Sequence, residues 1–133
     1  MILVDSSVLI DFLRGRETPG TATLWAALGT PGILIGNLVL CEVLLGVSNE
    51  REARDVEAWL RCFDIVPIVD DDLAVLAARN YRVLRSLGVT VGKTIDLLIA
   101  TRCMHEDFAL LHNDRDFTAI AAHLPLREMP HAG

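Results

Sequence analysis

The segment Met1–Leu13, MILVDSSVLIDFL, contains the pattern that decides the fold. Ile2–Val4 is a run of strand-forming apolar residues, and a strand buried on both faces reads as such a continuous run. Asp5 ends the run, and the two serines after it can begin a helix whose apolar positions lie between residues 8 and 13. In an open α/β sheet, ligands bind beyond the carboxyl ends of the strands. The sequence therefore places Asp5 where a functional acid would lie.

The composition describes one folded domain. The chain has 133 residues, enough for a substantial core, and 52% of them are hydrophobic. No apolar run reaches the roughly 18 residues that a membrane span needs. No basic segment precedes the first apolar run, which is too short for a signal peptide, so we expect a cytosolic protein with no membrane partner. Cys41, Cys62 and Cys103 form no CxxC pair, which argues against disulfides or zinc and favours reduced core residues.

Strand and helix patterns alternate along the whole chain. Further strands are predicted at residues 33–35, 65–69 and 108–111, with a short strand or tail at 124–129. Helices are predicted between them, at residues 23–28, 37–47, 48–61, 70–87, 95–104 and 118–122, with Thr94 as the N-cap of the helix at 95–104. Gly15, Pro19 and Gly20 are expected to break the pattern after the opening helix. Pro67 favours an edge position for its strand. This alternation is typical of the α/β class, with a central parallel sheet of four to five strands flanked by helices.

The helix predicted after Asn37, its expected N-cap, contains one acidic residue in apolar surroundings. The segment is apolar on nearly every face, so we expect the helix to be buried. Glu42 lies in its middle, and burying an ionised carboxylate is costly unless it is paired or bound to a cation. Glu42 therefore requires an arginine partner, a cation, or a water-facing edge.

Two other segments carry acidic residues in positions like that of Asp5. Asp96 lies in the first turn of a helix, and the apolar residues that directly follow it indicate that this end is buried. The fourth strand ends in HNDRDF, residues 112–117. This segment repeats the opening order of strand, acid and helix, with Asp114 and Asp116 as its acids.

Five acidic residues are therefore candidates for both catalysis and metal binding: Asp5, Glu42, Asp96, Asp114 and Asp116. We expect them to converge, because a parallel sheet brings strand ends and helix starts to one edge. Two like charges about 4 Å apart repel by about 4 kcal/mol at an effective dielectric constant of about 20, so such a cluster holds protons or a divalent cation. Carboxylates without Cys or His ligands favour Mg²⁺, or Mn²⁺, over Zn²⁺. Such ions suit phosphodiester hydrolysis.

The formal net charge of −6 argues against a nucleic-acid partner. Setting aside the five candidate ligands leaves 13 of the 18 acidic residues against 12 basic ones, which removes most of that objection. Arg14, Lys93 and Arg115 are candidates for contact with phosphates, with a solvated surface role as the alternative. His112 is a candidate general base because histidine titrates near neutral pH, but a hydrogen-bonded place at the rim of the site is the preferred interpretation.

Four segments in one order carry a family resemblance: DSSVLIDFLRG at residues 5–15, LCEVLLG at 40–46, TIDLLIA at 94–100 and LLHNDRDF at 110–117. Together they resemble the four motifs of PIN-domain ribonucleases, and more narrowly those of the VapC toxins of bacterial toxin–antitoxin modules. The resemblance covers the chain from end to end. It implies a single PIN-like nuclease domain over residues 1–133.

The resemblance also implies a function. It implies a Mg²⁺-dependent endonuclease that cuts RNA, often a tRNA or rRNA loop, and a homodimer held inactive by a cognate antitoxin. Asp5, Glu42 and Asp96 match the family's metal-binding acids, and Ser7 matches the Ser or Thr that accompanies the first acid.

The fourth ligand is left open by a departure from the family pattern. Many members carry Thr-x-Asn where this chain has Leu111-His112-Asn113. Either Asp114 or Asp116 can then be the fourth ligand, and Asp114, nearer the strand end, is favoured. The alternative function is a catalytically inactive PIN-fold module that binds a partner protein, against which the retention of all the acids argues.

Overall fold

The computed structural model describes residues 1–130, and within that range the chain forms five strands and seven helices. Residues 131–133 of the expected domain lie outside the described residues. The strands are β1 (Ile2–Val4), β2 (Ile33–Gly36), β3 (Asp64–Val66), β4 (Ala109–Leu111) and β5 (Arg127–Met129). They form one sheet in the order β3-β2-β1-β4-β5, and every neighbouring pair is parallel. The predicted α/β class and parallel sheet are confirmed.

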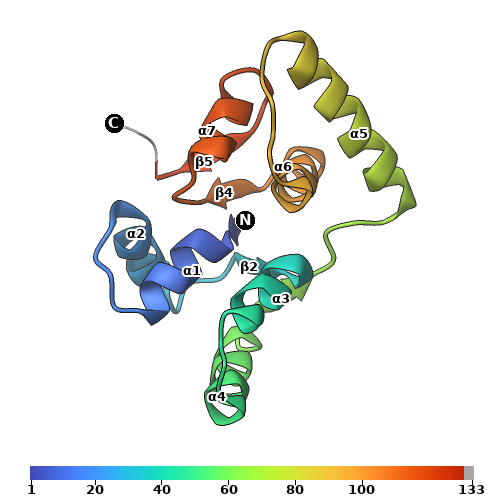
Figure 1. The fold of residues 1–133 in the computed structure, drawn as a ribbon. Helices are drawn as coiled ribbons and strands as arrows, with labels where there is room; N and C mark the ends of the chain where they lie inside the picture. Colours follow the sequence, from blue (N-terminus) through green and yellow to red (C-terminus); the bar gives the residue numbers. More distant parts are fainter. Residues whose placement is uncertain (131–133) are drawn as a thin grey trace.

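The helices cover both faces of this sheet. They are α1 (Ser6–Leu13), α2 (Pro19–Ala27), α3 (Asn37–Leu45), α4 (Glu50–Leu60), α5 (Asp71–Ser86), α6 (Thr94–Glu106) and α7 (Arg115–Ala121). The chain proceeds from β1 through β2 to β3, then returns to the other side of β1 for β4 and β5. Right-handed crossovers therefore put α1–α4 on one face and α6 and α7 on the other, as Figure 1 shows, with α5 outermost against α6.

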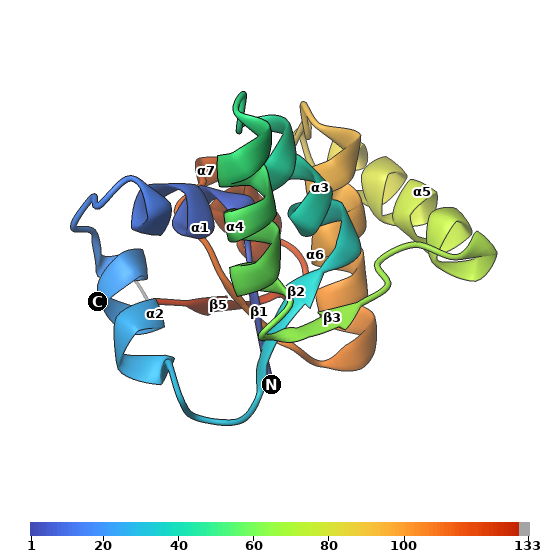
Figure 2. The same cartoon turned by 90° about the horizontal axis from the view of Figure 1, so that it is seen from below.

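The central strand β1 fixes the position of Asp5. Leu3 and Val4 are fully buried, and Val4 pairs with Leu111 of β4. The backbone N–H of Asp5 donates to the carbonyl oxygen of Leu111 at 2.9 Å, so Asp5 continues this pairing beyond the strand. Figure 2 shows the neighbouring β2 running directly into α3. The carboxyl edge of the sheet is therefore also where α1 and α3 begin.

Helices α2 and α3 begin differently from the prediction. Pro19, expected to break the pattern, is the first residue of α2, where its missing N–H costs nothing. Gly36 is the N-cap of α3, and the side chain of Asn37 instead accepts a hydrogen bond from the N–H of Ile68 at 3.2 Å. The side chain of Asn37 thus ties the start of α3 to the segment that follows β3.

Other starts and ends also shift. Lys93, not Thr94, is the N-cap of α6. Strand β3 ends before Pro67, which has no N–H to donate, and lies at the sheet edge as that proline predicts. Helix α7 begins at Arg115, three residues earlier than expected, because Asp114 caps it. None of the helices in the described residues is long and apolar enough to cross a membrane.

The expectation that the helix after Asn37 is buried is wrong. In α3 only Val39 and Val43 are buried, and Leu45 is 80% exposed. The reason is that α3 packs on α1, α4 and the end of β2 through one stripe, which leaves its other faces to solvent. Of the cysteines expected in the core, only Cys103 is buried, while Cys41 on α3 and Cys62 are exposed.

Gly36, at the junction of β2 and α3, has no room for a side chain. A Cβ at Gly36 would lie 2.6 Å from Cδ1 and 2.8 Å from Cγ1 of the fully buried Ile68. We expect Gly36→Ala to lower the free energy of unfolding by about 1–3 kcal/mol, the usual cost of overpacking. Urea unfolding measures it. Gly46→Ala, at the other end of α3, meets only an ordinary contact at 3.5 Å and serves as the control, with an expected change near zero. Equal effects of the two variants would contradict the prediction.

Candidate metal centre

Asp5 is buried, with one carboxylate oxygen bonded and the other free. As the N-cap of α1 it uses Oδ2 to accept hydrogen bonds from the N–H of Ser7 at 3.1 Å and from the Ser7 hydroxyl at 2.7 Å. The residue is 3% exposed, and its Oδ1 has no hydrogen-bond partner among the described residues. The capping bonds therefore orient the carboxylate and leave a buried oxygen available to a ligand.

Asp96 presents the same feature from the opposite face of the sheet. It lies in the first turn of α6 and is 4% exposed, and its Oδ2 is buried without a hydrogen-bond partner in the described part of the chain. Leaving a buried polar group unsatisfied costs about 1–3 kcal/mol, and more for a charged group. Two such oxygens at one edge of the sheet indicate that something outside the chain satisfies them.

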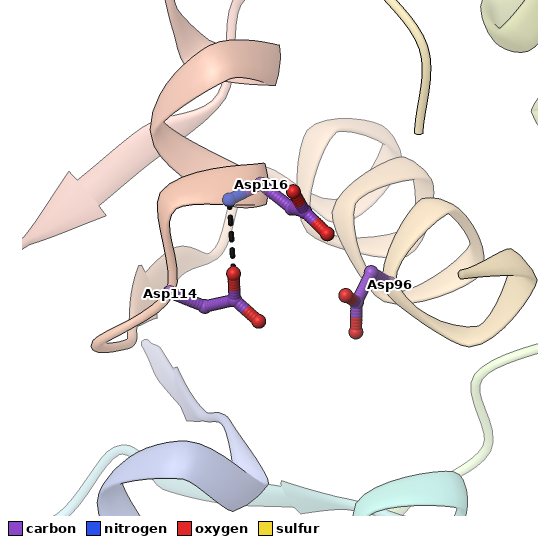
Figure 3. Close-up of side chains that lie close together, drawn as sticks. All are labelled: Asp96, Asp114 and Asp116. Carbon is purple, nitrogen blue, oxygen red and sulfur yellow. Dashed lines mark hydrogen bonds between the residues drawn. The ribbon is translucent and has the colours of Figure 1, made fainter. Parts of the chain in front are cut away.

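Asp114 and Asp116 approach Asp96 from the start of α7. Each of these three aspartates offers an oxygen, and these atoms all lie within 4.8 Å of one another. Figure 3 shows the three carboxylates directed toward a common space between α6 and α7. Asp114 caps α7, and its Oδ1 accepts from the N–H of Asp116 at 2.9 Å. Ligand oxygens about 2.1 Å from a Mg²⁺ ion lie at most about 4 Å apart, so the three carboxylates lie close to the spacing that one ion requires.

Glu42 reaches the site from α3, half-buried. Its Oε1 accepts a hydrogen bond from the Ser6 hydroxyl at 3.3 Å. The two adjacent serines thus bind two different acids, Ser6 binding Glu42 and Ser7 binding Asp5. Among the described residues Glu42 forms no ion pair with an arginine. Of the three environments that the sequence allowed for Glu42, the structure shows the water-facing edge, beside the other acids.

Burial and neighbouring charges raise the pKa values of three of the acids, Asp5, Glu42 and Asp96. Burial, and then the charges of Asp5 and Asp114, raise the pKa of Asp96 to about 7. Burial also raises the pKa of Asp5, against the hydrogen bonds from Ser7, and the charge of Asp114 adds to the increase. Burial and the charge of Asp5 raise the pKa of Glu42. These mutual effects place Asp5 and Glu42 beside the three clustered aspartates, so all five predicted acids meet at one edge.

Lys93, which the sequence offers as a candidate for contact with phosphates, lies beside two of the acids. It precedes α6, and its side chain is exposed. Its positive charge partly offsets the increase in the pKa values of Glu42 and Asp96. Lysine at a helix N-terminus opposes the helix dipole, which is a local signal that another role is being served. Its position three residues before Asp96 was visible in the sequence, but its nearness to Glu42 was not.

Both ring nitrogens of His112 form hydrogen bonds, which agrees with the preferred interpretation of a hydrogen-bonded residue beside the site. Its Nδ1 accepts from the N–H of Asp114 at 3.2 Å, and its Nε2 lies 2.8 Å from Oε2 of Glu128 on β5. Since Nδ1 accepts a hydrogen bond, Nε2 carries the hydrogen atom and is the donor of the hydrogen bond to Glu128. With both nitrogens engaged, His112 serves as a support for Asp114.

The donor set fits a divalent cation. It consists of carboxylate oxygens, which are hard ligands suited to Mg²⁺ and Mn²⁺, and two of them are buried oxygens with no partner in the described residues. The acids also raise one another's pKa values, so a bound cation would relieve both the repulsion and the missing hydrogen bonds. This site is therefore built to bind a positive charge.

Comparison with known proteins agrees with this geometry. The chain is 27% identical over 126 residues to the VapC ribonuclease Mb1587 of Mycobacterium bovis, covering 91% of this chain and 92% of that protein. It is 28% identical over 109 residues to the ribonuclease VapC1 of Methanocaldococcus jannaschii, covering 82% and 72%.

Solved structures share the fold at lower identity. VapBC2 of Rickettsia felis, bound to a DNA fragment from its promoter, matches with a TM-score of 0.77 and 19% identity over 96% of this chain and 97% of that one. VapC20 of Mycobacterium tuberculosis, described as a sarcin-ricin loop cleaving toxin, matches with a TM-score of 0.65 and 21% identity, covering 96% and 99%. A family model described as the PIN domain matches residues 2–123. Since that match spans nearly the whole chain and contains all five acids, the chain belongs to the PIN domain family.

Proposed function

We propose that this protein is a metal-dependent endoribonuclease toxin that hydrolyses RNA phosphodiester bonds and is neutralised by a cognate antitoxin. The observation that carries the catalytic part is the pair of buried, unpartnered oxygens of Asp5 and Asp96 beside further carboxylates. Relatives over most of the chain are named ribonucleases, which supports RNA as the substrate. The proposed nuclease domain comprises the whole chain, residues 1–133.

Mg²⁺ is the proposed ion, with Mn²⁺ as the alternative. Asp5, Asp96 and Asp114 are the proposed principal ligands, and Glu42 and Asp116 complete the acidic site. Such an ion polarises a phosphoryl oxygen and lowers the pKa of water, so that a nucleophile is available at neutral pH.

The chain's own residues prepare the site for this ion and for the substrate. Ser7 holds Oδ2 of Asp5, which leaves the buried Oδ1 without a partner in the described residues and available to a ligand. The cluster would repel an RNA phosphate by itself, so a phosphate that binds here needs a neutralising positive charge. Lys93 is exposed beside Glu42 and Asp96, where its ammonium group can receive the approaching phosphate. Catalysis here depends on positioned charge rather than on a histidine base.

The proposed partners follow from the relatives. Several solved structures that share the fold are toxin–antitoxin complexes, including VapBC of Salmonella typhimurium, which supports an antitoxin protein as a partner. The proposed substrates are tRNA or rRNA, and one solved relative is described as cleaving the sarcin-ricin loop. A homodimer is part of the same proposal and stays a prediction.

The function can be tested directly against its alternative, a catalytically inactive binding module. Purified protein free of antitoxin is incubated with total RNA in Mg²⁺ and, separately, in EDTA. We expect discrete fragments only with Mg²⁺, because the carboxylates need the cation to act. Sequencing of the fragment ends then identifies the target RNA. An absence of metal-dependent fragments from every RNA would favour the binding module.

Asp5→Asn should abolish this cleavage. Even the loss of residues that only support a metal ligand costs about 10–100-fold, so we expect a loss of at least about 100-fold for a ligand itself. The melting temperature without metal should stay the same or rise, since a buried charge is removed. Asp55→Asn, on the exposed face of α4, is the matched control and should cut like the parent. Undiminished cleavage by Asp5→Asn would place the site elsewhere.

A pair of substitutions can decide whether Asp114 or Asp116 is the fourth metal ligand. The charge of Asp114 raises the pKa values of both Asp5 and Asp96, which places it nearer the centre of the site. Asn caps a helix about as well as Asp, so Asp114→Asn preserves α7. We expect Asp114→Asn to reduce the cleavage rate at least about tenfold more than Asp116→Asn does, measured at saturating Mg²⁺. The reverse order would make Asp116 the fourth ligand.

The raised pKa of Asp96 predicts a pH-dependent stability. Because that pKa is about 7 in the folded chain and 3.8 ordinarily, the folded metal-free state binds more protons than the unfolded state between about pH 4 and 7. Stability therefore falls as pH rises through this interval. We expect a lower melting temperature at about pH 8 than at about pH 5, with Mg²⁺ raising it more at the higher pH. Asp96→Asn should flatten both trends, and an unchanged profile in that variant would refute the assignment.

A further inference from the structure

A chain of hydrogen bonds joins the middle of α1 to the site through the loop between β4 and α7. Oδ2 of Asp11 accepts from Nδ2 of Asn113 at 3.3 Å. The backbone N–H of Asn113 donates to Oγ of Ser7 at 3.1 Å, and the Ser7 hydroxyl donates to Oδ2 of Asp5 at 2.7 Å. Three hydrogen bonds thus connect Asp11 to the carboxylate of Asp5 through Asn113, which lies more than one hundred residues further along the chain.

Asp11 is a buried acid that the proposed metal site does not use. It is 9% exposed, and it does not belong to the group of oxygens that cluster at Asp96. Its other oxygen, Oδ1, accepts from the guanidinium of Arg16 at 3.4 Å, but the Arg16 side chain is 62% exposed. An ion pair so open to water contributes little, which leaves its bond to Asn113 as the contact that accounts for Asp11.

The residue after Asn113 is Asp114, whose carboxylate lies close enough to that of Asp5 for its charge to act on it. Asn113 is exposed, and the apolar core of the chain does not hold it. Repulsion between Asp5 and Asp114 acts outward on this loop, against the hydrogen bonds of His112 that support Asp114. A tether on the side chain of Asn113 opposes the same repulsion.

We propose that Asp11 is a positioning residue for the metal centre, which acts by holding Asn113 so that Asp114 stays opposite Asp5 and the Ser7 hydroxyl stays aimed at Asp5. Asp11 contacts neither the ion nor the RNA. This inference rests on the proposed function for its cleavage readout, while its metal-binding readout is independent of RNA.

Two measurements test Asp11→Ala. Binding of Mn²⁺ to the purified protein without RNA is measured by titration calorimetry, and cleavage kinetics are measured with the RNA that the parent cuts. Loss of a residue that orients metal ligands costs about 10–100-fold, so we expect Mn²⁺ affinity or kcat to fall by that factor. The KM for RNA should stay within about twofold, because no RNA contact is removed.

Three further variants separate positioning from general structure. Asp11→Asn keeps an oxygen that accepts from Asn113 and should restore most of the lost affinity and rate. Asn113→Ala should match Asp11→Ala, and the double variant should be no worse than either single one, since both remove the same bond. Arg16→Ala removes only the other partner of Asp11 and should behave like the parent. If Asp11→Ala does not fold, Asn113→Ala, at an exposed position, carries the test.

The outcomes distinguish this inference from the proposed function. Parent-like Mn²⁺ affinity and kcat in Asp11→Ala or Asn113→Ala would overturn the positioning role. An equal loss in Arg16→Ala would overturn it too, because the ion pair would then be the contact that matters. If the parent binds Mn²⁺ but cuts no RNA, the proposed function fails, while weakened Mn²⁺ binding in Asp11→Ala still supports the positioning role.

Discussion

The burial of Asp5 beside other carboxylates is the interaction on which the rest of the structure depends. Asp5 extends the pairing of the central strand with β4, so it cannot move away from the edge of the sheet where Asp114 follows. Glu42 and Asp96 then begin or line helices on opposite faces at the same edge. Burial, and then the charges of neighbouring acids, raise the pKa values of Asp5, Glu42 and Asp96, and a bound cation would oppose both effects.

The chain holds three of the acids, Asp5, Glu42 and Asp114, by one oxygen each. Ser7 binds Oδ2 of Asp5, Ser6 binds Oε1 of Glu42, and the N–H of Asp116 binds Oδ1 of Asp114. Every bonded oxygen orients its carboxylate and leaves the second oxygen for a ligand. Carboxylate oxygens left without partners lower the stability of the metal-free chain, but they make the site ready for a ligand. Such departures from the usual rules of folding are expected at functional sites.

Much of the fold could be predicted from local patterns, and its failures have local causes. The apolar run at Ile2–Val4 predicted a buried strand, and the structure makes it the centre of the sheet. Pro19 was misjudged because proline both breaks and begins helices, and only the cap at Thr18 decides which. The helix after Asn37 was expected to be buried, since composition does not show that only one stripe of α3 meets a neighbour.

The sequence by itself determined which acidic residues are the candidates for the chemistry. Acids at strand ends and in first helical turns are marked by their immediate neighbours, and the motifs at residues 5–15, 40–46, 94–100 and 110–117 identify the family. Only the tertiary structure decided how they meet: that Ser6 binds Glu42, that Lys93 lies beside the acids, and that Asp11 reaches Asn113. These contacts depend on strand order and crossover direction, which join residues far apart in the chain and leave no local trace in it.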